Sequence, residues 1–241
     1  MDDYARIKRI SQGTDSTEED FHDIYEEASA ITTRVLGSMQ TLAGTANCKG
    51  VQIHNLAEWA KENGYWIDSP FPYGVYADRG SENEVYLSNN GRYLFKLNDF
   101  RYSDDNLTPF FERIKAHNYY FPDCEYRMIG MSENRDGQVC AVLVQPFITA
   151  ERESTEEEIA AELQNMGFKM QYDGECFTNG VHDIYDARPN NVLMGVDGRL
   201  YFIDPIIYVS SADTLRSYHS QSPRFSGKKL NPNLKLNFFT I

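Results

Sequence analysis

Three polar side chains in the last third of the sequence have the types and spacing that phosphoryl transfer requires. Asp186 and Asn191 lie five positions apart, and Asp204 follows a predicted hairpin. The reaction needs a carboxylate near the attacking hydroxyl, oxygen ligands for Mg2+ and a cation near the phosphate oxygens. A tight loop would bring Asp186 and Asn191 together, and Arg188 adds a positive charge within it. The pattern predicts a phosphotransfer site, with a hairpin carrying a polar turn as the alternative.

The same stretch resembles the catalytic loop of protein kinases. That pattern is Asp-x-Lys-Pro-x-Asn followed by two apolar residues and, beyond a hairpin, by the Asp of the Asp-Phe-Gly motif. Here Arg188 replaces the lysine and Pro189 stands where proline is common. The resemblance implies that Asp186 is the catalytic base and that Arg188 contacts the γ-phosphate of ATP. It also implies that Asn191 and Asp204 hold Mg2+.

Two departures from the kinase pattern change what is expected of this loop. Ile184-Tyr185 replaces His-Arg before the catalytic aspartate, which removes the usual anchor for a phosphorylated activation loop. Pro205-Ile206 replaces Phe-Gly after Asp204, so we expect a fixed metal loop. His182 could be a proton shuttle or a ligand, although a structural histidine on a strand is the preferred interpretation.

The elements expected upstream have the order of a protein-kinase small lobe. Aromatic and β-branched runs between turn signals predict strands at 73–77, 84–88, 92–97, 125–131 and 138–144. Thr108-Pro109 predicts the start of a helix that runs to about His117. The order strand, strand, strand, helix, strand, strand matches the five-stranded antiparallel small lobe of that family. We therefore expect an α+β, protein-kinase-like fold with two lobes.

Lys96 and Glu112 occupy positions that the resemblance makes functional. Lys96 lies on the third of these strands, where the family has its lysine for the α- and β-phosphates. Glu112 lies on the following helix and would be its ion-pair partner. The alternatives are a solvated lysine at a sheet edge and an ordinary exposed glutamate on a helix.

Two backbone segments are expected to contact the nucleotide. Residues 78–85 keep one glycine and one valine where the family usually has three glycines before the valine. Gly80 and Ser81 could donate backbone N–H groups to a phosphate, or they could form a plain hairpin turn. Residues 145–148, which include Gln145 and Phe147, are expected to be the hinge between the lobes and to pair with an adenine edge. A simple strand exit is the alternative.

Helices are expected before the small lobe, and a reduced large lobe after it. An amphipathic pattern predicts a helix over 20–42, capped by residues 16–19, and a second helix is predicted over 56–62. A capping box at Thr155 and Glu158 predicts a helix that ends at Gly167. Further strands are predicted at 168–172, 181–184, 192–194 and 200–203, and a short helix at 212–219. We expect a helical segment at 1–68, a small lobe at 69–148 and a reduced large lobe with a tail at 149–241, against which the N-terminal helices could pack.

Composition limits the classes of partner. The net charge of −13 and the pI near 4.8 argue against a broad surface for nucleic acid or anionic lipid. No apolar run approaches the roughly 18 residues that span a bilayer, and the first residues are acidic where a signal peptide is basic. We expect a cytoplasmic protein with no nucleic-acid or membrane partner. The four cysteines contain no Cys-x-x-Cys pair, which favours reduced, partly buried thiols over a zinc site.

Two longer stretches resemble a more specific family, the compact serine/threonine/tyrosine kinase-like domain of polyvalent proteins in bacterial mobile elements. They are Tyr-Asp-Ala-Arg-Pro-x-Asn-Val-Leu at 185–193 and Asn-Gly-Arg-Tyr-Leu-Phe-Lys-Leu at 90–97. The resemblance implies ATP and Mg2+ as cofactors and phosphotransfer to a protein. A catalytically inactive pseudokinase and an enzyme that transfers AMP from ATP remain alternatives. Survival of the full polar set favours an active enzyme: Lys96, Glu112, Asp186, Asn191 and Asp204.

Overall fold

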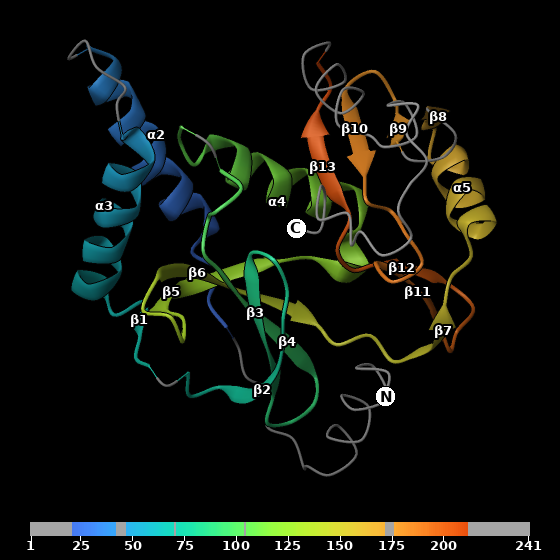
Figure 1. Cartoon of the computed structure of the whole chain (residues 1–241), viewed down its shortest axis with the longest axis horizontal. Helices are drawn as coiled ribbons and strands as arrows, with labels where there is room; N and C mark the ends of the chain where they lie inside the picture. The colour runs from blue at the N-terminus through green and yellow to red at the C-terminus, as the bar shows by residue number, and fades with distance from the viewer. Residues whose placement is uncertain (1–20, 42–46, 70, 104, 172–175, 212–241) are drawn as a thin grey trace, which may run out of the picture. The chain divides into compact units, whose positions relative to one another are not determined.

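The chain folds into two compact units, Met1–Thr149 and Ala150–Ile241. The computed structural model describes residues 21–41, 47–69, 71–103, 105–171 and 176–211 (Figure 1). The predicted helix cap at 16–19 and the predicted helix at 212–219 lie outside these residues. Both units combine helices with sheets, so the predicted α+β class is confirmed.

Two N-terminal helices, α2 (Tyr25–Thr41) and α3 (Cys48–Asn63), lie side by side in the first unit (Figure 1). Helix α3 begins eight residues earlier than predicted. Its first turns are held by Gln52, whose amide donates to Thr32 O at 2.9 Å and accepts from Leu107 N at 2.8 Å. The helix ends where expected, at Gly64 with φ 77°, because glycine tolerates the left-handed conformation.

A six-stranded sheet forms the centre of the first unit, in the order β1-β5-β6-β4-β3-β2. The strands are β1 (Trp66–Ile67), β2 (Gly74–Arg79), β3 (Asn83–Ser88), β4 (Tyr93–Asn98), β5 (Arg127–Glu133) and β6 (Val139–Pro146). Helix α4 (Thr108–Tyr120) and the short 3-10 helix η2 (Pro122–Cys124) connect β4 to β5. The predicted order of three strands, a helix and two strands is therefore present from β2 to β6.

The prediction of a five-stranded antiparallel sheet is wrong, because β1 adds a sixth strand parallel to β5. This strand has only two residues, which is too short for a periodic signal in the sequence. It can approach β5 because Gly130 has no side chain: a Cβ there would lie 2.4 Å from Tyr65 O. Met131 N donates to that carbonyl at 3.0 Å, and Ser132 Oγ donates to Ile67 O at 2.8 Å.

The two faces of the sheet carry different cores. Phe95 and Leu97 of β4 are buried in a cluster with Phe71 and residues of β5 and β6. A second cluster joins β5 and β6 to α2, α3 and α4. Helix α2 contributes Ala28 and Ile31 to it, Ile24 joins from the position before α2, and α3 contributes Leu56 and Ala60. The N-terminal helices thus complete the core of the first unit.

The second unit has one helix and two small sheets among its described residues. Helix α5 (Glu156–Asn165) starts with the predicted capping box, in which Glu158 N donates to Thr155 Oγ1 at 3.2 Å and Thr155 N donates to Glu158 Oε2 at 2.8 Å. One sheet has the order β12-β11-β7 and the other β13-β10-β9-β8. Their strands are β7 (Ala150–Glu153), β8 (Lys169–Gln171), β9 (Cys176–Thr178), β10 (His182–Tyr185), β11 (Val192–Gly195), β12 (Leu200–Phe202) and β13 (Ile206–Val209). The sequence did not predict β7, β9 or β13.

The four cysteines are free, as predicted, but they are more deeply buried than predicted: Cys48, Cys124, Cys140 and Cys176 are each at most 1% exposed. Over the described ranges, no helix is both long enough and apolar enough to cross a membrane.

Candidate active site

Asp186 lies directly after β10 in a backbone conformation that is uncommon for residues other than glycine. Its φ is 53°, in the left-handed region, which costs a residue other than glycine free energy and is often kept at functional sites. Asn191 stabilises this geometry from the other end of the loop. Its Nδ2 donates to the Asp186 backbone O at 2.8 Å and to Asp186 Oδ2 at 2.9 Å. The five-residue spacing seen in the sequence thus closes a tight loop.

Arg188 lies inside this loop and pairs with its carboxylate. Arg188 Nε is 3.0 Å from Asp186 Oδ1, and the arginine side chain is 59% exposed whereas that of Asp186 is 7% exposed. Backbone bonds also connect the three residues, since Arg188 N donates to Asp186 O and Asn191 N donates to Arg188 O. The loop therefore holds a buried carboxylate under an accessible guanidinium.

Asp204 completes the group, because the β11–β12 hairpin returns the chain to the loop. Ile203 N and Asp204 N both donate hydrogen bonds to Asn191 O, at 2.9 and 3.4 Å. After Pro205 the chain enters β13, which pairs antiparallel with β10, the strand that leads to Asp186. We call Asp186, Arg188, Asn191 and Asp204 the loop cluster. The structure brings all four of these predicted residues together within the second unit.

The environment of Asp186 raises its pKa to about 6. The largest cause is burial, which disfavours the charged carboxylate. Arg188 and the Asn191 amide lower the pKa, and the negative charge of Asp204 raises it. A carboxylate with this pKa is ionised at neutral pH and can accept a proton.

The oxygen atoms of the loop cluster fit Mg2+. This ion prefers carboxylate and amide oxygens and is usually bound by one or two carboxylates together with substrate phosphates. Asp204 supplies a carboxylate. Asn191 supplies Oδ1, which accepts one hydrogen bond, from Asn190 Nδ2 at 2.9 Å, and has a second lone pair. Within the part of the chain that the structure describes, no cluster of three or more His, Cys, Asp or Glu side chains could hold a metal.

Lys96 belongs to the first unit, where it is 6% exposed. Its Nζ donates to the Tyr126 hydroxyl at 2.8 Å and lies 4.9 Å from the centroid of that ring. The predicted ion pair with Glu112 is not formed between these two described residues. The cause is the rotational position of α4: Phe111 and Ile114 face the core, and Glu112, one residue further around the helix, is exposed.

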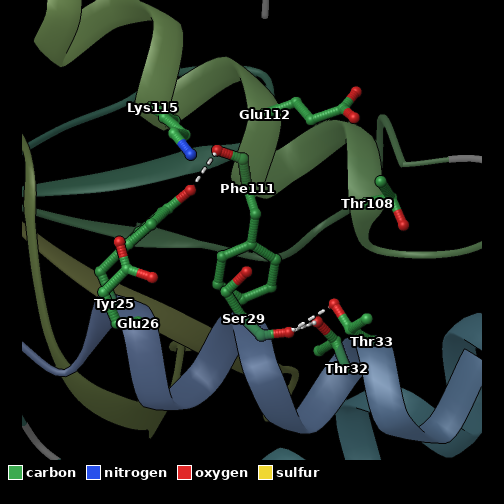
Figure 2. Close-up of a pocket in the computed structure, with 9 residues that line it drawn as sticks. All are labelled: Tyr25, Glu26, Ser29, Thr32, Thr33, Thr108, Phe111, Glu112 and Lys115. Atoms are coloured by element: carbon green, nitrogen blue, oxygen red, sulfur yellow. Dashed lines mark hydrogen bonds between the residues drawn. The ribbon is translucent and has the colours of Figure 1, made fainter.

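Figure 2 shows Glu112 among the side chains that line a pocket of about 220 Å3 between α2 and α4. Tyr25 joins the two helices there, since its hydroxyl donates to Phe111 O at 2.8 Å. Burial raises the pKa of Tyr25 to about 12, with further contributions from nearby carboxylates. The full set of lining residues is Tyr25, Glu26, Ser29, Thr32, Thr33, Thr108, Phe111, Glu112 and Lys115.

Both segments that were predicted to contact the nucleotide form hydrogen bonds to backbone carbonyl groups of the protein. In the β2–β3 turn, Gly80 N donates to Asn83 O at 2.8 Å, whereas Ser81 Oγ is buried without a hydrogen-bond partner among the described residues. In the predicted hinge, Gln145 Nε2 donates to Cys124 O at 2.8 Å. Phe147 N donates to Arg92 O at 2.8 Å. The amides of Gly80 and Phe147 thus already have acceptors within the protein.

The residue that the sequence did not point to is Tyr126. It precedes β5 by one position and contacts Lys96, which is 30 residues earlier. A contact over this sequence distance leaves no local pattern, and a tyrosine next to a strand is most simply interpreted as a core residue.

Comparison with known proteins places the chain in a family. The model of a family described as serine/threonine/tyrosine kinase found in polyvalent proteins matches residues 49–211, which is more than half of the chain. A search of curated proteins found no match. The matched region contains both Lys96 and the loop cluster. The chain therefore belongs to the serine/threonine/tyrosine kinase family found in polyvalent proteins.

Proposed function

We propose that the protein is an ATP- and Mg2+-dependent phosphotransferase whose acceptor is a hydroxyl group of a protein. One observation carries the proposal: Asp186 is buried in a strained loop closed by Asn191, with Arg188 and Asp204 beside it. Membership of a kinase family supports phosphotransfer in general. The ATP, the metal and the protein acceptor are parts of the proposal.

Each residue of the loop cluster has a chemical role in this proposal. Asp186 accepts the proton of the acceptor hydroxyl while that oxygen bonds to the γ-phosphorus and ADP leaves. Its two oxygens each have a further lone pair beyond the bonds to Arg188 and Asn191. The exposed Arg188 guanidinium contacts the γ-phosphate. Asn191 and Asp204 would hold Mg2+, which neutralises phosphate charge when it is bound.

The first unit would supply the nucleotide contacts. Lys96 binds the α- and β-phosphates, and the backbone N–H of Ser81 would donate to a phosphate from the β2–β3 turn, where the Gly80 amide is already bonded to Asn83 O. Adenine recognition by the backbone around Gln145 and Phe147 stays part of the proposal. Glu112 is also proposed for the nucleotide site. To reach Lys96, helix α4 would have to rotate from the orientation that it has in the structure.

The resemblance to kinases is also the basis for the lobes and the cellular location that we propose. Residues 69–148 would be the small lobe, 149–241 a reduced large lobe with a tail, and 1–68 an N-terminal helical segment, of which α2 and α3 pack on the small lobe. A fixed metal loop is favoured by β13, which begins two residues after Asp204 and pairs with β10. We further propose a cytoplasmic enzyme of bacterial mobile elements that has no nucleic-acid or membrane partner.

A pseudokinase is the second candidate, and two observations favour it. Lys96 and Glu112 do not form the expected ion pair, and the Gly80 amide is used within its own turn. Such a module could bind nucleotide and transfer nothing. Transfer of AMP is a third outcome, because the loop cluster by itself does not select which phosphorus is attacked.

The first test follows label from ATP to protein. The purified protein is incubated with Mg2+ and with ATP labelled at either the γ- or the α-phosphate. We expect γ-label on protein, and a loss of at least about a hundredfold in Asp186→Asn, because the general base is removed. The matched control is Asp197→Asn, which changes an exposed aspartate that pairs with Arg199 in the β11–β12 turn. Transfer of α-label would replace the proposal by AMP transfer, and absence of both labels would favour the pseudokinase.

A further inference from the structure

Lys96 needs a partner inside the fold, because its ammonium group is almost completely buried. The side chain lies on a central strand of the sheet, between β3 and β6. Removing a charged amine from water is costly unless hydrogen bonds or aromatic rings replace the water. Tyr126 provides both: its hydroxyl accepts from Lys96 Nζ at 2.8 Å, and the Nζ lies 4.9 Å from its ring centroid. Tyr126 is itself 8% exposed.

The position of Tyr126 is determined by the C-terminal end of α4. Asn118 Nδ2 donates to Tyr126 O at 2.7 Å, and Asn118 Oδ1 accepts from Tyr126 N at 2.8 Å. This pair of bonds ties the residue before β5 to the helix. The His117 ring packs against the Tyr126 ring with a centroid distance of 4.6 Å. Helix α4 is thus connected to Lys96 through Asn118 and Tyr126, whereas Glu112 is exposed.

We infer that Tyr126 is the residue through which α4 positions Lys96 for nucleotide phosphates, an inference that rests on the proposed function of Lys96. A tyrosine partner differs chemically from a glutamate. A phenol is neutral, so this contact orients the ammonium group without itself cancelling the charge. Tyr126 is a positioning residue, because it acts through Lys96.

Binding of Mg-ATP to matched variants tests this inference. Tyr126→Phe removes the hydroxyl and keeps the ring. We expect it to raise the Kd for Mg-ATP by about tenfold, the effect of losing one hydrogen bond to a charged group. Tyr86→Phe is the control: it removes another buried hydroxyl of the same sheet, which donates to Glu84. That variant should bind as the wild type does. Wild-type affinity in Tyr126→Phe, or an equal loss in Tyr86→Phe, would overturn the inference.

A measurement without nucleotide separates this inference from the proposed function. The NMR resonances of the Lys96 side chain should be shifted by the Tyr126 ring, should keep most of that shift in Tyr126→Phe and should lose it in Tyr126→Leu. An unchanged Lys96 signal in Tyr126→Leu would show that the contact is not made, and would overturn the positioning role. If the wild type binds no Mg-ATP while the NMR shifts behave as expected, the proposed function fails and the link from α4 to Lys96 stands.

Discussion

At the scale of single residues, Asp186 combines three properties. It has a left-handed backbone, a side chain that is 7% exposed, and a pKa raised to about 6. The loop keeps this arrangement because Asn191 and Arg188 both bond to the carboxylate. Strain and burial each cost stability, and such costs are commonly found where a residue has a function.

The pKa of Asp186 leads to a prediction about pH. Below about pH 6 the carboxyl group is protonated and cannot accept a proton, so kcat/KM for phosphotransfer should rise with pH around a midpoint near 6 and level off above about pH 7. The measurement is the initial rate of γ-label transfer across pH. Asp197→Asn should keep the same profile, and a rate that stays constant from about pH 5 to 8 would contradict the role of Asp186 as the base.

At the scale of elements, the packing of short strands determines where the functional residues lie. Strand β10 leads into Asp186, and β13 follows Asp204 and pairs with β10. Asp186 and Asp204 therefore lie at the same end of this pair of strands. In the first unit, β1 occupies an edge of the sheet beside β5, and its position depends on the absence of a side chain at Gly130.

Gly130→Ala should therefore weaken the first unit. The added Cβ would lie 2.4 Å from Tyr65 O and 3.1 Å from Ile67 Cδ1, so β1 must shift, and we expect a loss of about 1–3 kcal/mol in the free energy of unfolding. Urea unfolding measures this change. Gly37→Ala is the matched control: it lies in α2 with nothing within 4 Å and should gain about 0.5–1 kcal/mol. Equal stability of the two variants would show that β1 does not pack closely on β5.

At the scale of the whole molecule, the first unit begins before the region that the family model matches. The family match begins at residue 49, whereas α2 spans Tyr25–Thr41. Ala28 of this helix and Ile24 directly before it are nevertheless completely buried, in the same cluster as Phe111 of α4 and Met128 of β5. Helix α2 therefore packs against α4, the helix whose Asn118 also binds the backbone of Tyr126.

We expect the stability of the first unit to depend on α2. Ile24, directly before α2, is fully buried, so Ile24→Ala should lower the free energy of unfolding by about 2–5 kcal/mol through lost burial and a cavity where α2 begins. Circular dichroism during urea unfolding measures this loss. Glu27→Ala, on the exposed side of the same helix, should change stability by less than about 0.5 kcal/mol. Similar midpoints for both variants would show that α2 is not part of the cooperative core.

The sequence alone determined the features that depend on neighbouring residues. The spacing of Asp186 and Asn191 predicted a closed loop, because five residues can fold back only in a tight turn. The capping box of Thr155 and Glu158 was predicted for a similar reason, since both of its bonds lie within one helical turn. The order of strands and of α4 followed from local periodicity and turn residues.

Only the tertiary structure decided which distant residues meet. The direction in which Glu112 points depends on how α4 rotates against α2 and the sheet, and the helical sequence permits other rotations. The contact of Lys96 with Tyr126 joins residues 30 apart, and the pairing of Trp66 with Met131 joins residues on strands that are distant in sequence. Such contacts form only when the whole core packs, because their free energy comes from burial shared by several elements.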